Sequence, residues 1–212
     1  MTLTAVLRPA AGEPEGALVL LHGRGSDEHD LQPLLDALDP ERRLVGIFPR
    51  GPLALPPGGA HWYLVERIGF PHAASFREGF EQAATFVDGL AEQVGVPLER
   101  TVIGGFSQGA VMSFALGLMA GRPSPAGILA LSGFIPTVEG YPLDLAGHRD
   151  VPVALEHGTL DPVISVAFAR EARDMLEGAG YHLRYREVAM EHTIDPGGLP
   201  GLADWLFRAL DG

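Results

Sequence analysis

The chain has 212 residues and a formal net charge of −12, from 15 basic and 27 acidic side chains. Its length suits one domain of residues 1–212, and a hydrophobic fraction of 46% is typical of a globular protein. Because the charge balance is acidic, nucleic acid is not an expected partner. The sequence has no cysteine and no lysine, which excludes disulfides, thiolate nucleophiles, Schiff bases and P-loop phosphate binding.

The N-terminal segment and the apolar runs give no sign of a membrane or export signal. Met1–Pro9 has no basic region followed by a long apolar run, so we expect no signal peptide. The longest apolar stretches are too short or too interrupted to span a bilayer. We therefore expect a cytoplasmic protein without a membrane span.

Short apolar runs alternate with segments of helical periodicity along most of the chain. The predicted strands are residues 17–21, 44–48, 101–106, 127–131 and 151–156, followed by the alternating segment 182–188 near a sheet edge. The predicted helices are residues 28–38, 75–95, 108–120, 163–178 and 199–210. Buried strands that alternate with helices indicate an α/β fold, with a mostly parallel central sheet and helices on both faces.

Residues 50–74 interrupt this alternation. The segment is rich in proline and glycine, and it contains Trp62, Tyr63 and Phe70. A loop of this length in a compact domain is usually functional or disordered. Because ligands bind beyond the carboxyl ends of the strands in open parallel sheets, we expect this loop to cover an active site there.

Gly105–Gly109 reads Gly-Phe-Ser-Gln-Gly and directly follows an apolar run. In hydrolases with a G-x-S-x-G motif, the serine lies on a strained turn between a strand and a helix, with its hydroxyl group exposed. The outer glycines are needed because a side chain would clash where the strand and helix cross. An ordinary glycine- and serine-rich turn before a helix has the same pattern, so the motif alone leaves both interpretations open.

Two later strand ends supply partners for this serine. A serine nucleophile needs a base, and the base needs an orienting group. Ser107, Asp161 and His192 have the chain order Ser, Asp, His of the G-x-S-x-G hydrolases, and each follows a different predicted strand. We therefore expect them to meet at one edge of the sheet. Asp161 is also suited to cap the helix that begins near Val163.

Other residues compete for the roles of base and acid. His157 lies in the same short loop as Asp161, and an acid and a base from one loop rarely converge on a serine from another, so we favour His192. Asp195 lies three residues after His192 and just before a proline. We interpret Asp195 as a turn residue or as a cap of the last helix.

Backbone N–H groups are expected to bind the oxyanion that forms during acyl transfer. One should come from Gln108, the residue after the serine, and the other from Arg24 in the glycine-containing loop after the strand 17–21. His22, which precedes Gly23, is interpreted as a brace of this loop rather than as a proton carrier.

Five segments together resemble the small carboxylesterase/phospholipase group of α/β-hydrolases, which includes the acyl-protein thioesterases. They are Leu21–Ser26, Gly104–Ala110, Leu131–Gly133, His157–Val163 and His192–Ile194. The resemblance implies the α/β-hydrolase fold, a Ser107–His192–Asp161 triad, ester hydrolysis and no cofactor. It also implies a homodimer as a possible assembly. No histidine spacing of a metal hydrolase is present, so no metal is expected.

Two departures from the family pattern bear on function. Many relatives have glycine before the catalytic histidine, and here Glu191 precedes His192. Its carboxylate either lies near the imidazole and raises the pKa of the histidine or points into solvent, and we favour solvent. Relatives that act on acylated proteins usually have leucine and aspartate where this chain has Arg24 and Ser26, which favours a bacterial small-ester hydrolase.

The resemblance places Trp62 near the acyl pocket. We expect the loop to form one pocket wall and Phe134 with Ile135 to form another, with ordinary core packing as the alternative for each residue. The expected pocket residues are Trp62, Leu64, Phe70, Phe134, Ile135 and Val163, with Leu53 and Leu55 in the same wall.

These observations predict a serine carboxylesterase that hydrolyses small-molecule esters of short to medium acyl chains through an acyl-enzyme. An acyl-protein thioesterase or lysophospholipase with a long acyl groove is the alternative within enzymes. A non-catalytic binding module on a hydrolase fold is the alternative outside enzymes.

Overall fold

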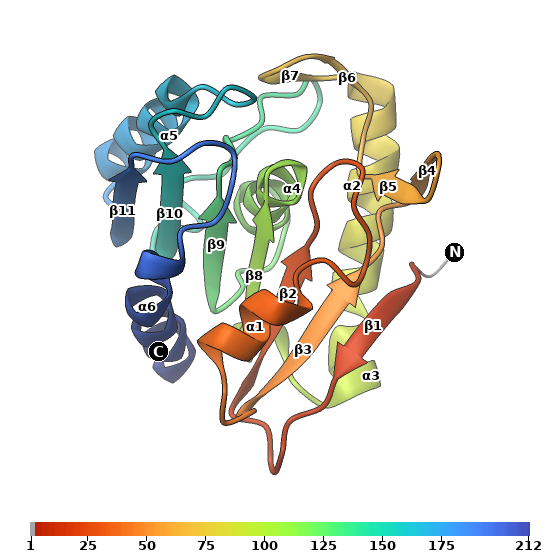
Figure 1. Cartoon of the computed structure of the whole chain (residues 1–212), viewed down its shortest axis with the longest axis vertical. Coiled ribbons are helices and arrows are strands. Elements are labelled where there is room, and N and C mark those ends of the chain that lie inside the picture. The colour runs from red at the N-terminus through yellow and green to blue at the C-terminus, as the bar shows by residue number, and fades with distance from the viewer. Residues whose placement is uncertain (1–2) are drawn as a thin grey trace.

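The computed structural model describes residues 3–212; Met1 and Thr2, where the segment considered for a signal peptide begins, lie outside this range. Its centre is a seven-stranded sheet of order β1-β3-β2-β8-β9-β10-β11 (Figure 1). β1 pairs antiparallel with β3, and all other neighbours are parallel. The strands are Ala5–Arg8 (β1), Gly16–Leu21 (β2), Leu44–Pro49 (β3), Thr101–Phe106 (β8), Gly127–Leu131 (β9), Val153–Gly158 (β10) and Leu183–Val188 (β11).

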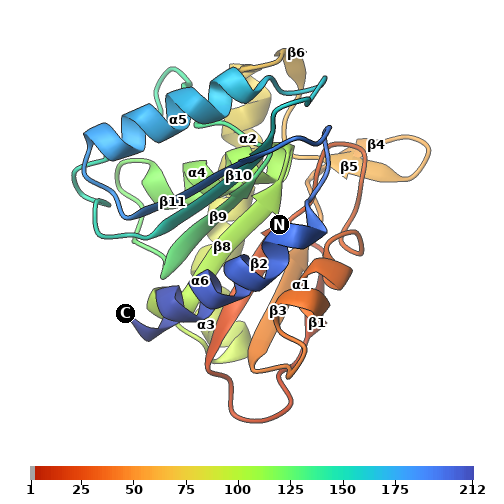
Figure 2. The same cartoon turned by 60° about the vertical axis from the view of Figure 1, so that its left-hand side comes forward.

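Helices cover both faces of the sheet (Figure 2). On β2, Leu18 and Leu20 pack with α1 and α6, whereas Val19 and Leu21 pack with α2 and α4. This alternation follows from the two-residue period of a strand with both faces buried. The helices are Gln32–Leu38 (α1), Ala73–Asp88 (α2), Leu90–Val94 (α3), Gln108–Leu118 (α4), Val166–Gly178 (α5) and Leu199–Asp211 (α6). The prediction of a mostly parallel sheet with helices on both faces is confirmed.

Several element boundaries differ from the predictions. The helix predicted over residues 75–95 is divided at Gly89 into α2 and α3. The helix predicted from residue 28 begins only at Gln32, after a turn, with a proline in its first turn. β1 was not predicted, because it is four residues long and only its last residue is buried. Within residues 3–212, no helix is long and apolar enough to cross a membrane.

The segment 50–74 is built from two hairpins rather than from irregular loop. Leu53–Leu55 (β4) pairs with Gly59–His61 (β5), and Val65–Arg67 (β6) pairs with Phe70–Pro71 (β7). The β6–β7 hairpin lies beyond the carboxyl ends of the parallel strands, at the top of Figure 1. The segment therefore reaches the edge of the sheet where the site was expected.

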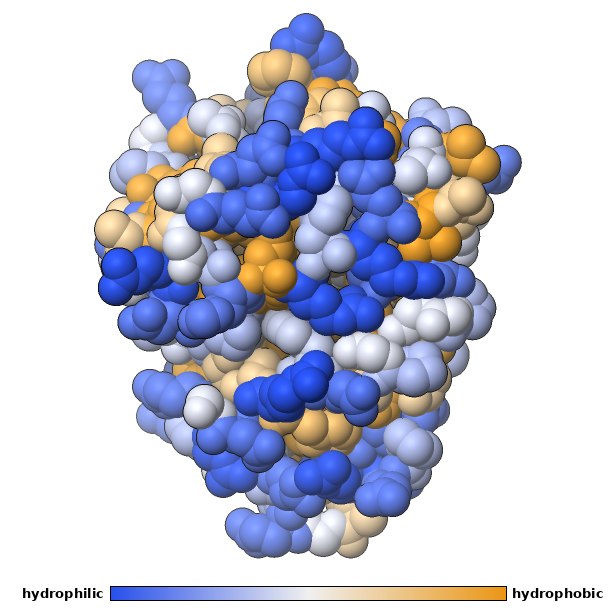
Figure 3. Space-filling view, turned by 90° about the vertical axis from the view of Figure 1, so that its left-hand side faces the viewer, coloured by the Kyte–Doolittle hydropathy of each residue, from blue (hydrophilic) through white to orange (hydrophobic). Residues whose placement is uncertain are grey.

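Two charged clusters hold the outer strands of the sheet. At the β11 edge, Arg184 and Arg186 bind the buried Glu156 of β10, at 2.5 and 3.4 Å. The side of the molecule that carries this edge is largely hydrophilic (Figure 3). Charged side chains on an edge strand discourage pairing with a second sheet.

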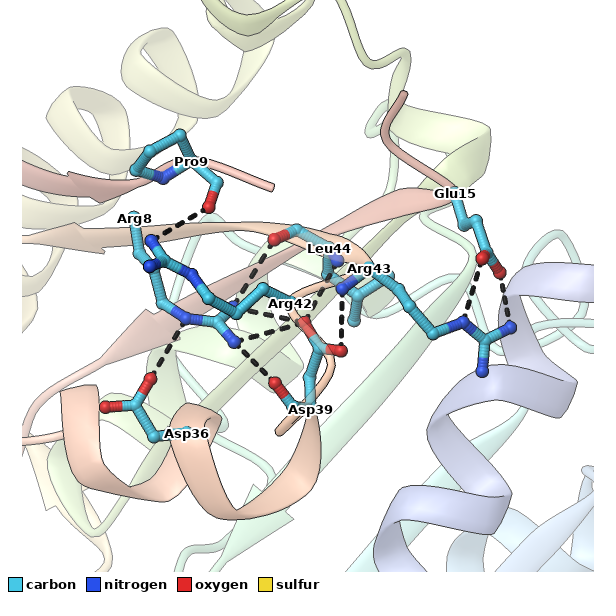
Figure 4. Close-up of polar contacts among 8 residues, drawn as sticks. All are labelled: Arg8, Pro9, Glu15, Asp36, Asp39, Arg42, Arg43 and Leu44. Carbon is cyan, nitrogen blue, oxygen red and sulfur yellow. Dashed lines mark hydrogen bonds and ion pairs between the residues drawn. The ribbon is translucent and has the colours of Figure 1, made fainter. Parts of the chain in front are cut away.

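At the opposite edge, β1 is anchored by a buried ion pair (Figure 4). The Nη1 atom of Arg8 lies 3.1 Å from Oδ2 of Asp39, which follows α1. The Asp39 carboxylate also accepts the backbone N–H groups of Arg43 at 2.8 Å and Leu44 at 3.0 Å. A buried charge is tolerated when it is paired and hydrogen-bonded in this way. The cluster joins β1, the end of α1 and the start of β3.

Candidate active site

Ser107 lies on the turn between β8 and α4, with φ of 56° and ψ of −118°. A positive φ is unusual for a residue with a side chain, and such strain often marks a functional position. A Cβ atom on Gly109 would lie 1.8 Å from the backbone oxygen of Leu21, and one on Gly105 would lie 2.5 Å from the carbonyl carbon of Gly109. Both outer glycines of the motif are therefore needed where α4 crosses β2 and β8.

The side chains of Ser107, His192 and Asp161 form a hydrogen-bonded chain. His192 Nε2 lies 2.8 Å from the Ser107 Oγ, and His192 Nδ1 lies 2.6 Å from the Asp161 Oδ2. With the proton on Nδ1, the imidazole donates to the carboxylate and accepts from the serine hydroxyl. The Asp161 side chain is fully buried and that of His192 is 16% exposed. This arrangement can remove the serine proton and hold the resulting imidazolium.

Asp161 also organises the turn that follows it. Its Oδ1 accepts the backbone N–H groups of Val163 and Ile164, each at 2.8 Å. The helix expected near Val163 starts later, and Ser165 caps it by accepting the N–H of Ala167 at 3.3 Å. Asp161 is therefore not the helix cap. It uses one oxygen for this turn and the other for His192.

His157 does not contact Ser107. Its ring is fully buried, and its Nε2 lies 2.8 Å from the Ile164 carbonyl oxygen and 3.4 Å from the Asp161 Oδ2. Burial lowers the pKa of His157, although the Ile164 carbonyl opposes this effect. A neutral His157 with its proton on Nε2 therefore supports the turn that carries Asp161.

Two further acids singled out in the sequence are Asp195 and Glu191. Asp195 accepts the N–H of Gly197 at 3.0 Å, at the start of a short 3₁₀ helix, and pairs with Arg186 at 2.5 Å. This is the turn role expected for it. Glu191 is exposed, in line with the orientation into solvent that we favoured.

The loop after β2 lies against the serine. A Cβ atom on Gly23 would be 3.5 Å from the Ser107 Cβ. Within residues 3–212, the backbone N–H of Arg24 donates to no protein acceptor. Gln108 is the first residue of α4, so its N–H has no acceptor within the helix. Both N–H groups are thus available beside Ser107.

His22 braces this loop, as its position before Gly23 suggested. Its Nδ1 lies 2.7 Å from the Gly23 carbonyl oxygen, and its Nε2 accepts the N–H of Gly51 at 3.0 Å. Burial lowers the pKa of His22, with the Gly23 carbonyl as an opposing influence. The neutral ring is the form that can make both hydrogen bonds.

Trp62 is a structural residue of the site rather than a pocket wall. Its side chain is fully buried, and its Nε1 donates to the carbonyl oxygen of His22 at 2.9 Å. Its backbone N–H donates to the Gln108 Oε1 at 2.7 Å, and the Gln108 Nε2 donates to the Tyr63 carbonyl oxygen at 2.8 Å. The Gln108 side chain therefore joins residues 62 and 63 to the turn that carries Ser107, a role that the motif did not reveal.

A cavity of about 70 Å³ opens beside Ser107. Of the expected pocket residues, Phe134 and Val163 line it, whereas Trp62, Leu64, Phe70 and Ile135 do not. Leu64 and Phe70 are instead 48% and 53% exposed. The unpredicted lining residues are Arg24, Tyr63, Val65, Arg67, Ile68, Gly69, Pro71 and Ile164, together with Ser107 and Gln108. Most of them come from the β6–β7 hairpin, whose fold the composition of the segment does not specify.

A second serine–histidine pair lies elsewhere in the molecule. Ser124 Oγ is 2.9 Å from the Nδ1 of His148, beside a cavity of about 490 Å³ at the amino ends of β9 and β10. The other ring nitrogen of His148 faces the Met119 carbonyl oxygen at 3.4 Å, not a carboxylate. This pair therefore lacks the orienting acid that His192 has.

Among the residues that the structure describes, no group of three or more His, Cys, Asp or Glu side chains could hold a metal ion.

A sequence model of the phospholipase/carboxylesterase family matches residues 3–207. The chain belongs to this family. The resemblance seen in the sequence is confirmed.

Relatives and solved structures agree with membership of the phospholipase/carboxylesterase family. Acyl-protein thioesterase 1 of Candida albicans is 30% identical over 205 residues, which cover 85% of this chain and 86% of that protein. The crystal structure of esterase PE8 is 29% identical, with a TM-score of 0.86 over 99% of this chain and 100% of that one. The crystal structure of the Bacillus cereus carboxylesterase is 25% identical, with a TM-score of 0.83, and the match covers 98% of this chain and 94% of that one. The fold is that of the α/β-hydrolases.

Proposed function

We propose that this hydrolase is a serine carboxylesterase that acts through an acyl-enzyme. The observation that carries the proposal is the hydrogen-bonded chain from Ser107 through His192 to Asp161. His192 takes the Ser107 proton as the Oγ attacks the ester carbonyl, and Asp161 stabilises the imidazolium. His192 then returns the proton to the leaving alcohol. Water repeats the sequence on the acyl-enzyme, which releases the carboxylic acid and restores Ser107.

The backbone N–H groups of Arg24 and Gln108 bind the oxyanion in this proposal. Both residues line the cavity at Ser107, and neither N–H is occupied by an acceptor from the described residues. Removing one such donor costs about 3 to 4 kcal/mol of transition-state stabilisation. Because these donors belong to the main chain, changing the side chain of Arg24 should affect the oxyanion contact only mildly. No step requires a metal or an organic cofactor.

Short to medium acyl esters are the proposed substrates. A cavity of about 70 Å³ is far below the roughly 300 to 1,000 Å³ of typical drug-sized ligand sites, so it suits a short acyl group.

Thioester hydrolysis is the second candidate, because several relatives are named acyl-protein thioesterase 1. A series of oxygen esters and thioesters from acetyl to palmitoyl separates the two. A preference for oxygen esters of two to eight carbons supports the first, and a preference for palmitoyl thioesters contradicts it.

The central test is the Ser107→Ala variant. It should abolish p-nitrophenyl butyrate hydrolysis while the circular dichroism and melting temperature stay near those of the parent protein. A fluorophosphonate probe should label the parent protein at Ser107 and leave the variant unlabelled. Near-parental turnover in the variant contradicts the assignment, and absence of labelling in the folded parent favours a non-catalytic binding module. We further propose a cytoplasmic protein, with a homodimer as a possible assembly.

A further inference from the structure

The cavity beside Ser107 combines apolar walls with two arginines. Arg24 comes from the loop after β2, and Arg67 comes from the β6–β7 hairpin. No aspartate or glutamate is among the residues that line the cavity. The chain as a whole has a formal net charge of −12, whereas the residues that line this cavity include two arginines and no carboxylate.

Most arginines of the chain are already paired with a carboxylate. Those with a carboxylate oxygen within 4.0 Å are Arg8, Arg43, Arg50, Arg122, Arg149, Arg170, Arg173, Arg184 and Arg186. Within residues 3–212, Arg24 and Arg67 have no such partner. Glu66, the acid nearest in sequence to Arg67, instead lies 3.9 Å from the Nε2 of His72.

Arg67 is held in place without using its N–H groups. Its guanidinium carbon lies 3.7 Å from the centroid of the Phe70 ring, and the two residues are register partners in the hairpin. Stacking on an aromatic face fixes a guanidinium plane and leaves the in-plane N–H donors free. An arginine in this state is suited to bind a carboxylate, because its planar fork matches the two carboxylate oxygens.

The cavity lies on the acyl side of the scissile bond. This step rests on the proposed esterase function. His192 protonates the leaving alcohol, so the alcohol must lie beside the imidazole, and His192 is not among the residues that line the cavity. The cavity instead contains Ser107 and the two oxyanion residues. The part of the substrate that enters it is therefore the acyl chain.

We propose that the enzyme prefers esters whose short acyl chain ends in a carboxylate, the half-esters of small dicarboxylic acids. The methylene groups of such a chain contact the apolar walls formed by Val65, Ile68 and Phe134, and the terminal carboxylate binds Arg67 with Arg24. The chemistry is unchanged: Ser107 forms the acyl-enzyme, the alcohol leaves, and water releases the diacid.

The test compares mono-p-nitrophenyl glutarate with p-nitrophenyl pentanoate, which have the same acyl length and differ in the terminal carboxylate or methyl group. After subtraction of the uncatalysed rate, kcat/KM should be about tenfold higher for the glutarate ester at low salt, since two exposed ion pairs contribute roughly 1 to 2 kcal/mol together. This preference should decline between 0.05 and 0.5 M NaCl because exposed charges are screened.

Arg67→Gln should reduce the ratio of the two kcat/KM values at least threefold. Arg77→Gln is the matched control, because Arg77 is also exposed and outside any ion pair within residues 3–212, but lies on α2 outside the cavity. A glutarate-to-pentanoate ratio of kcat/KM at or below one in the parent protein overturns the inference. The same ratio in Arg67→Gln as in Arg77→Gln also overturns it.

Binding distinguishes failure of this inference from failure of the esterase proposal. If neither ester is hydrolysed, the esterase proposal fails, and the anion site is judged on glutarate and pentanoate binding to the Ser107→Ala protein by NMR titration. The site is supported if glutarate binds more tightly than pentanoate to the Ser107→Ala protein and this difference disappears in the Ser107→Ala, Arg67→Gln double variant. Equal binding of the two acids overturns it.

Discussion

Replacing Gln108 by methionine tests whether its side chain holds the site together. Methionine has a similar length but can replace neither hydrogen bond of the amide. The backbone N–H of Trp62 and the carbonyl of Tyr63 would lose partners at 2.7 and 2.8 Å, and both residues are buried. Each buried backbone group left unpaired costs about 1 to 3 kcal/mol, so the free energy of unfolding should fall by about 3 kcal/mol.

Urea denaturation measures this loss, and p-nitrophenyl ester kinetics measure its effect on the cavity. Because Tyr63 lines the cavity, KM should rise for the short esters. The backbone N–H of Gln108 is retained, so kcat should fall less than in Ser107→Ala. Gln93→Met on the exposed surface of α3 is the control and should stay within about 0.5 kcal/mol of the parent. An equally small change for Gln108→Met would refute the structural role of the amide.

Three further substitutions test the packing and the buried charges. Gly109→Ala should prevent folding or lower the free energy of unfolding, measured by urea denaturation, by more than about 3 kcal/mol, because its Cβ would lie 1.8 Å from the Leu21 oxygen. Gly178→Ala is the control: its Cβ would meet no atom within 4 Å, so the substitution should be neutral or stabilising. Asp39→Asn should lower the free energy of unfolding by about 2 kcal/mol, because it removes the buried one of the two carboxylates that pair with Arg8 and leaves only the exposed Asp36; a loss below 1 kcal/mol would contradict this. Burial lowers the pKa of His157, so the unfolded chain binds a proton below about pH 6.5 that the folded protein resists, and stability should fall as pH drops from 7 to 5. His157→Gln should make that fall shallower in melts at each pH, and an unchanged slope would argue against a buried neutral histidine.

The sheet and its active-site edge could be predicted from sequence because they depend on local patterns. The runs 17–21, 101–106 and 127–131 are apolar on both faces, and such runs leave few alternatives to buried parallel strands. The same patterns located the ends of the strands, and therefore the loops that bring Ser107 and His192 together. β1 escaped prediction because a short edge strand with three partly or largely exposed residues has no clear period.

The cavity could not be predicted, because its walls depend on contacts between distant residues. Trp62 was expected in the acyl pocket, yet the Gln108 amide and the His22 carbonyl bind its two N–H groups and turn the indole into the core. These contacts span 46 and 40 residues along the chain. No local pattern encodes them. The stacking of Arg67 on Phe70 likewise depends on the register of a hairpin that the composition does not specify.

The two carboxylate oxygens of Asp161 have different partners, and this decides which residues can be varied to change the acyl groups that the protein accepts. One carboxylate oxygen holds the N–H groups of Val163 and Ile164, and the other holds His192. Because Val163 and Ile164 also line the cavity, a redesign that shifts the backbone of that wall also shifts Asp161 and should lower turnover. The β6–β7 hairpin lines the other side and, within residues 3–212, forms no hydrogen bond to the side chains of Ser107, His192 or Asp161. Libraries for new substrates should therefore vary residues 65–71 and leave 161–164 unchanged.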